Sequence, residues 1–207
     1  MSEKQKSFYE SLGAKRLYKI SPYIPDENEN KNKNNVIGNE KVRFLISGFP
    51  ISIYRLKESI YIFSRLSKAG KIFHLDICLY GFDYEGLQSE IISLASTLPS
   101  YTIFTHLNEK EFNRVLSATD IYLRLNSVDS FGLIVAEAIS KGINVITTDV
   151  CERYPGSNLV AVDDFETVYS EINYYIKFRK MSGTLPIQQK VVSEIDYDEF
   201  LDVFLEP

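Results

Sequence analysis

Apolar and polar positions follow one another along most of this chain in two repeating patterns. Short apolar runs typical of buried strands are followed by longer windows in which apolar residues recur at helical spacing. The predicted strands cover residues 42–47, 74–80, 101–106, 121–125, 144–148 and 159–162, and the predicted helices cover 55–68, 84–98, 109–117, 129–142 and 165–180. This alternation predicts an α/β fold: a Rossmann-like parallel β-sheet with helices on both faces.

The first 35 residues do not follow this pattern. A weakly helical piece at 8–12 precedes an extended run at 16–24, and then comes DENENKNKNN at 26–35, which has no apolar residue. Such a composition cannot support packing and is typical of a flexible linker. We therefore divide the chain into an N-terminal arm with an interdomain-type linker, 1–35, and a Rossmann-like domain, 36–207.

The stretch DSFGLIVAEAISKG, residues 129–142, carries the most specific pattern for chemistry. Asp129 or Ser130 is expected to cap a helix that stops at Gly142. The helix is apolar almost all round except for Glu137, and a buried carboxylate requires a hydrogen-bonding partner. A helix N-terminus binds phosphate through its free N–H groups and the positive end of its dipole. Glu137, two turns deeper, would then face the ribose of a nucleotide, and Asp129 would face the group that the diphosphate carries.

A purely structural interpretation of the same stretch stays open. On a helical wheel at about 100° per residue, one side collects the polar side chains Ser130, Glu137, Ser140 and Lys141. In that interpretation they form only the solvated stripe of an amphipathic helix and bind no ligand.

Further candidates lie where predicted strands end, because parallel sheets bind ligands at their carboxyl edge. Gly48 would let a phosphate approach the backbone, although a glycine at a strand end more often serves only the turn. Arg55 and Lys57 head the next helix, where cations are unfavourable unless an anion is near. Arg124 faces either the cleft or solvent.

Composition narrows the class of protein. The net charge of −5 argues against a duplex-binding surface over the whole protein; local basic clusters stay open, and no nucleic-acid partner is expected. We identify no membrane span or signal peptide, and Cys78 and Cys151 lack metal or redox spacing, which favours a reducing cytoplasm. Two histidines are too few for a zinc site without many carboxylates, so no metal or cofactor is expected.

The run ATDIYLRLNSVDSFGLIVAEAISKGINVITTDV, residues 118–150, resembles the C-terminal domain of glycosyltransferase family 4 (group 1), which has the GT-B fold. The family pattern is an acidic residue, a Phe-Gly pair, a Glu eight positions after the acidic residue, a small-residue helix, Gly, and a strand ending near Thr-Asp. The matching residues are Asp129, Phe131, Gly132, Glu137, Ala138, Gly142 and Asp149. More weakly, FLISGFP with Lys57 and ICLYGFD resemble two other family elements, so the resemblance covers roughly 36–162.

The resemblance implies a donor site for a nucleotide-diphosphate sugar and metal-independent, retaining glycosyl transfer, as in polysaccharide biosynthesis. It implies that Glu137 binds the ribose, that Asp129 touches the donor sugar and that Lys57 holds the diphosphate, the last two as the catalytic pair. The remaining implied donor-binding residues are Ser130, Phe131, Gly132, Leu133, Gly48 and Arg55.

Three departures from the family pattern bear on this expectation. Phe49 stands where the family has an Arg, Cys151 and Glu152 stand for a Gly-Gly pair, and Asp129 replaces the usual Glu. GT-B enzymes also have two Rossmann-like domains, and the segment FYESLGAKRLYKISPYIPD resembles the one that joins them. We therefore expect a donor-binding half that needs an N-terminal domain or partner chain to supply a glycan or lipid-linked acceptor.

Two hypotheses of different classes follow. The first is a glycosyltransferase donor domain in the cytoplasm, associated with a membrane only through a partner. The second is a non-catalytic GT-B-like scaffold or interaction module that has lost donor binding, which the departures at Phe49 and Asp129 favour. A periplasmic-binding-like or receiver-like sheet is less favoured, since no acidic receiver triad is evident.

Overall fold

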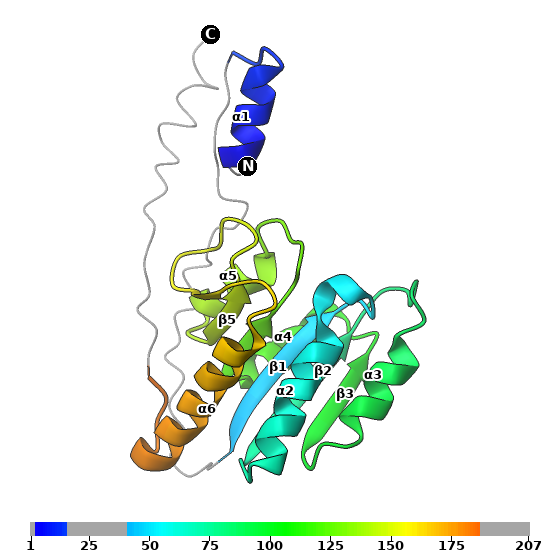
Figure 1. Ribbon diagram of the computed structural model, residues 1–207, viewed down its shortest axis with the longest axis vertical. Coiled ribbons are helices and arrows are strands. Elements are labelled where there is room, and N and C mark those ends of the chain that lie inside the picture. The colour runs from blue at the N-terminus through cyan, green and yellow to red at the C-terminus, as the bar shows by residue number, and fades with distance from the viewer. Residues whose placement is uncertain (1–2, 16–40, 187–207) are drawn as a thin grey trace.

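The computed structural model describes residues 3–15 and 41–186 (Figure 1). Its centre is a six-stranded, entirely parallel sheet with the strand order β3-β2-β1-β4-β5-β6. The strands are β1 (Val42–Gly48), β2 (Phe73–Leu79), β3 (Tyr101–Thr105), β4 (Ile121–Arg124), β5 (Asn144–Thr148) and β6 (Asn158–Val160). The predicted Rossmann-like fold class is confirmed, and the predicted strands differ from the observed ones by at most two residues at either end.

Helices cover both faces of the sheet (Figure 1). One face packs against α2 (Leu56–Lys68), α3 (Gln88–Ala95) and α6 (Phe165–Ser182), whose apolar side chains share a cluster with Phe44, Ile46 and Leu75. The other face packs against α4 (Glu109–Ala118) and α5 (Leu133–Ser140) around Leu45 and Tyr122. Burial on both faces explains why β1, β2, β4 and β5 are nearly continuous apolar runs.

The strand order reverses between β1 and β4. From β1 the chain moves outward through β2 and β3, then returns to β4 and moves the other way through β5 and β6. The loops after β1 and β4 therefore lead to helices on opposite faces of the sheet, α2 and α5. Open α/β sheets bind their ligands at the carboxyl edge between two such loops. One backbone hydrogen bond of 2.9 Å, from Ser127 N to Ile53 O, joins these two loops. Ile53 belongs to the short 3-10 helix η2 (Ser52–Tyr54).

Two predicted helices are shorter than expected. The helix predicted at 84–98 spans only α3, because Gly86 adopts a left-handed φ of +69° and the Asp83 carboxylate accepts the amides of Leu87 and Gln88. The helix for which Asp129 or Ser130 is the expected cap begins only at Leu133.

The N-terminal arm is described only in part. The helix predicted at 8–12 corresponds to α1 (Glu3–Ser11), which begins earlier. The extended run at 16–24 and the linker at 26–35 lie outside the described residues. Among the residues that are described, no helix is long and apolar enough to cross a bilayer.

Candidate functional site

Helix N-termini at the carboxyl edge fall into two groups. At α4, Asn108 Oδ1 accepts the Glu111 amide while Glu111 accepts the Asn108 amide, which closes a capping box. At α6, Asp164 accepts the Thr167 amide. At the start of α3, Asp83 accepts the amides of Leu87 and Gln88. No side chain caps α2 or α5, the helices that follow the two strands at the reversal. The first-turn amides of α2 and α5 thus have no side-chain acceptor.

The start of α5 corrects a prediction. Neither Asp129 nor Ser130 caps the helix: the N-cap is Gly132, in a left-handed conformation with φ of +76°, and no side chain accepts its first amides. Ser130 is exposed. The Asp129 carboxylate is turned toward two arginines instead, and it accepts only the amide of the adjacent Ser130, which precedes the helix.

These three side chains form a buried cluster, which we call the Arg-Asp-Arg cluster: Arg124, Asp129 and Arg153. Arg124 donates through Nε and Nη2 to both carboxylate oxygens, with 2.9 Å between Nη2 and Oδ1. Arg153 donates from Nη1 to Asp129 Oδ2 at 2.7 Å and from Nε to the Thr148 carbonyl at 3.1 Å. Side-chain exposure is 9% for Arg124, 7% for Asp129 and 1% for Arg153.

The ionisation of Asp129 follows from this geometry. Burial acts to raise its pKa, but the hydrogen bonds and positive charges of Arg124, and then of Arg153, outweigh burial and lower the pKa to about 2. Asp129 is therefore a carboxylate at neutral pH, with its charge already paired.

Glu137, predicted to bind ribose, lies on α5 and is partly buried. Its side chain is 25% exposed and its carboxylate lies 3.3 Å from the Lys141 ammonium. The hydrogen-bonding partner that the sequence required is therefore, in this structure, a cation one turn away. Ser140 departs from the predicted solvated stripe, because it is buried and donates to the Glu137 carbonyl.

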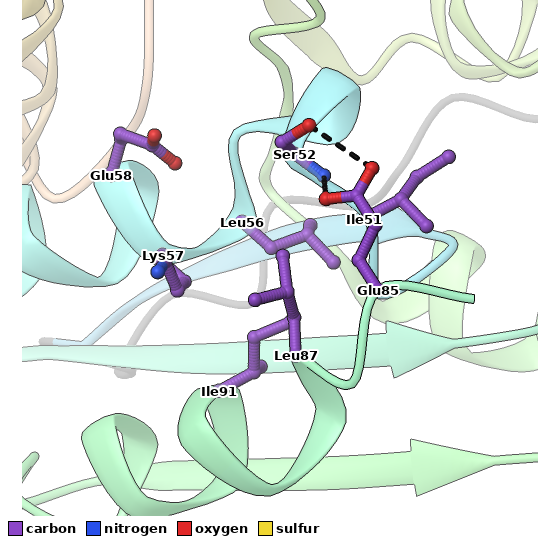
Figure 2. Close-up of a pocket in the computed structure, with 8 residues that line it drawn as sticks. All are labelled: Ile51, Ser52, Leu56, Lys57, Glu58, Glu85, Leu87 and Ile91. Atoms are coloured by element: carbon purple, nitrogen blue, oxygen red, sulfur yellow. Dashed lines mark hydrogen bonds between the residues drawn. The ribbon is translucent and has the colours of Figure 1, made fainter. Parts of the chain in front are cut away.

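The two predicted cations on α2 point to other partners. Lys57 lies 2.9 Å from Glu90 of α3, whose hydrogen bond raises the Lys57 pKa. It lines a pocket of about 180 Å³ between α2, α3 and the loops after β1 and β2 (Figure 2). Arg55 is turned toward Asp163, with 3.1 Å between Nε and Oδ1. The ion pairs of Lys57 and Arg55 are thus with Glu90 and Asp163, and not with the predicted site residues Asp129 and Glu137.

Gly48 has a packing role that the sequence did not indicate. A Cβ atom there would lie 2.2 Å from Cδ1 of Tyr54, so the glycine allows that ring to lie on the strand end. Tyr54, Phe49 and Tyr80 pack together with ring centroids 4.8–6.1 Å apart. Phe49, which replaces the Arg of the family pattern, thus belongs to an aromatic cluster beside β1.

The remaining predicted donor residues line the start of α5. Leu133 is 54% exposed, and Phe131 is partly buried against Tyr154 with 6.4 Å between ring centroids. Sequence reasoning missed Arg153 altogether and left the orientation of Arg124 open. The available signal was position: Arg124 is the second-last residue of a predicted strand, and Arg153 lies in the loop after the next one, at the same edge.

The described residues contain no group of three or more His, Cys, Asp or Glu side chains placed to hold a metal ion. Cys151, half-buried near this edge, has a pKa raised by burial, and burial raises the pKa of Cys78 to about 12. Neither thiol is therefore activated as a nucleophile.

Comparisons with known proteins support the fold. No protein-family model matches the sequence, and neither does any curated protein. Among solved structures, a crystal structure of TarM matches 99% of this chain and 42% of its own, at a TM-score of 0.74 and 11% identity. The apo structure of OtsA matches 69% of this chain and 36% of its own, at 0.57 and 10%. A glycosyltransferase from Rickettsia africae ESF-5 matches 68% and 38%, at 0.57 and 13%. The chain spans less than half of each of these proteins.

Proposed function

We propose that this chain is the donor-binding half of a glycosyltransferase, which binds a nucleotide-diphosphate sugar at the carboxyl edge between β1 and β4. The observation that supports the proposal most is the pattern of helix caps. At this edge a side chain just before α3, α4 and α6 accepts amides at the helix start, whereas at α2 and α5, beside the strand reversal, no side chain forms a cap hydrogen bond. Open amides at a helix N-terminus favour a phosphate ligand.

Distances along α5 agree with this ligand. Glu137 is the fifth residue of α5, roughly 6 Å along the axis from Leu133 at 1.5 Å per residue. A diphosphate on the first amides would bring the ribose to about that depth. The ion pair with Lys141 does not prevent this, because an i,i+4 pair on a helix stabilises by only about 0.5 kcal/mol and the Glu137 side chain is 25% exposed. Ribose hydroxyls can displace it.

The chemistry proposed for the whole enzyme is retaining transfer, in which cations and backbone amides stabilise the leaving diphosphate. In this chain the cations closest to the α5 amides are Arg124 and Arg153, whereas Lys57 would have to leave Glu90 to reach them. The acceptor would be a glycan or a lipid-linked molecule held by another domain or chain, since all three matched structures are more than twice as long as the matched segment.

A thermal-shift screen over UDP, GDP and ADP and their sugars tests the proposal. A ligand at a hundred times its dissociation constant stabilises the fold by about 2.7 kcal/mol. Glu137→Gln should abolish most of that shift with little change in intrinsic stability. Glu166→Gln is the control, because Glu166 also forms an ion pair with a cation, Arg65, which lies in the last turn of α2. Equal responses in the two variants would contradict the role of Glu137.

The second candidate, a scaffold without donor binding, is favoured by one observation. Phe49, Tyr54 and Tyr80 fill the end of β1 with aromatic rings where the family pattern has a Gly-Arg pair. If no nucleotide, nucleotide sugar or pyrophosphate shifts the melting temperature of the wild-type chain, this candidate replaces the first.

A further inference from the structure

The Arg-Asp-Arg cluster has one more positive than negative charge in a buried position. Arg124 and Arg153 face the single carboxylate of Asp129, and all three side chains are less than 10% exposed. The nearby acids Asp149 and Glu152 are exposed, where water screens their charge. A buried charge without a counter-charge is costly, so the cluster is short of one anion.

The cluster also lies at the positive end of α5. A Cβ atom on Gly132, the N-cap, would lie 2.6 Å from Arg153 Nη1 and 3.5 Å from Arg124 Nε. The glycine thus lets both guanidinium groups pack against the backbone at the helix start. Cations at a helix N-terminus oppose the dipole unless an anion is bound there. Two arginines at this position therefore increase the need for a bound anion.

One donor in the cluster has no acceptor. Arg153 Nη2 is buried without a hydrogen-bond partner, while its Nε and Nη1 are both bonded. An unpaired guanidinium nitrogen is not distinctive alone, since Arg43 and Arg179 each leave Nε unpaired at the opposite edge of the sheet. Those two arginines, however, bond to two aspartates, Asp76 and Asp120. Of these two groups of ion pairs, only the Arg-Asp-Arg cluster has more arginines than aspartates.

We propose that the Arg-Asp-Arg cluster and the first amides of α5 form one oxyanion site, in which Arg153 and Arg124 supply the charge and Asp129 is their internal counter-ion. Asp129 is then a positioning residue that holds the two guanidinium groups in place, and it does not itself touch the donor sugar. The inference rests on the proposed function for the nucleotide part of the ligand, but the oxyanion could belong to the diphosphate or to an acidic sugar attached to it.

Binding measurements on the purified chain test this site. The probes are pyrophosphate, UDP, GDP, ADP, UDP-glucose and UDP-glucuronate, each titrated by calorimetry into wild type, Arg153→Gln and Arg179→Gln. Loss of a charged hydrogen bond should weaken anion binding by Arg153→Gln roughly 10- to 100-fold. Arg179 is the matched control, because it is equally buried and ion-paired, to Asp120, but lies at the amino edge. Its variant should bind within about two-fold of wild type, as expected for a site at the other edge.

The probes separate the two sources of the oxyanion. A loss shared by pyrophosphate, the diphosphates and both sugars assigns the site to the diphosphate. A loss confined to UDP-glucuronate assigns it to a carboxylate on the sugar. If Arg153→Gln and Arg179→Gln bind every probe alike, the inference is wrong even though the proposed function stands. If only pyrophosphate binds, and in an Arg153-dependent way, the inference stands and the nucleotide function fails; if nothing binds, both fail.

Asp129→Asn separates the counter-ion from a sugar ligand. A positioning counter-ion affects pyrophosphate, UDP and UDP-glucose by the same factor, because it acts only through the two arginines that bind the shared oxyanion. A residue that touches the sugar affects UDP-glucose alone, and that result would overturn the positioning role. Should the Arg153 variant fail to fold, the guanidinium NMR signals of wild-type Arg153 provide the measurement: they should move on addition of pyrophosphate while those of Arg179 do not.

Discussion

Both edges of the sheet carry ion pairs between arginine and aspartate, but the ratio of arginine to aspartate differs between them. At the amino edge, Arg43 pairs with Asp76 at 2.8 Å and Arg179 pairs with Asp120 at 2.9 Å, so charges are balanced within the fold. Asp120 also accepts the Arg43 amide. At the carboxyl edge, two arginines share Asp129, and α5 begins without a cap. The amino edge thus has one aspartate for each arginine, whereas the carboxyl edge has one for two, and the proposed oxyanion site rests on that difference.

The largest expected effect lies at the amino edge. Asp76 is fully buried and accepts from Arg43 Nη2 at 2.8 Å and from His74 Nε2 at 3.1 Å. Asp76→Ala leaves Arg43 Nη2 without its carboxylate and His74 Nε2 with only the Thr102 hydroxyl, and it should lower the free energy of unfolding by about 3 kcal/mol, measured by urea denaturation. The double variant Asp76→Leu with Arg43→Met should recover most of that loss, because an apolar pair leaves no unpaired charge. Anion binding at the carboxyl edge should be unchanged in either variant.

The next effect concerns Asp129 and pH. Its pKa is about 2 in the folded chain, against about 4 when unfolded, so the carboxylate stabilises the fold above about pH 4 and that contribution disappears as pH falls toward 2. The difference in unfolding free energy between wild type and Asp129→Asn should therefore shrink by about 2 kcal/mol between pH 7 and pH 2. A difference that stays constant over this range would contradict the ion pairing in the Arg-Asp-Arg cluster.

How well the sequence predicted each feature depends on how far apart in the chain the contacting residues lie. The strands were predicted closely because both faces of the sheet are buried, which makes strands such as β1 and β2 largely apolar runs that end near Gly48 and Gly81. Helix starts depend on caps, and the start of α5 was wrong because its first turn is set by Gly132 and not by a polar side chain.

The site was predicted less well than the fold, for a physical reason. Asp129 binds Arg124, five residues earlier, and Arg153, 24 residues later, and Lys57 binds Glu90, 33 residues later. Periodicity reports neighbours on one element, whereas these pairs form only when the loops after separate strands meet at one edge. The family resemblance pointed to Asp129 and Glu137 as candidates but carried no information on the partners that this chain supplies.

A smaller effect tests the packing of the carboxyl edge. Gly81 and Gly86 have similar left-handed φ values of +73° and +69°, so Gly→Ala strains the backbone similarly at both. A Cβ on Gly81 would lie 1.7 Å from Cε1 of Phe49, whereas a Cβ on Gly86 meets nothing within 4 Å. Gly81→Ala should therefore destabilise by about 1 to 2 kcal/mol more than Gly86→Ala in thermal unfolding. Equal losses would show that the Phe49 ring moves away freely.

The smallest expected effect compares two helix starts at the same edge. Asn108→Ala removes the cap of α4 and should cost about 1 kcal/mol in urea unfolding, while Asn108→Ser should retain most of that stability. Ser130→Ala, before α5, should change stability by less than about 0.5 kcal/mol, because the Ser130 hydroxyl caps nothing. A cost at Ser130 equal to that at Asn108 would mean that a side chain closes α5 after all. The open amides on which both the donor site and the oxyanion site depend would then already be occupied.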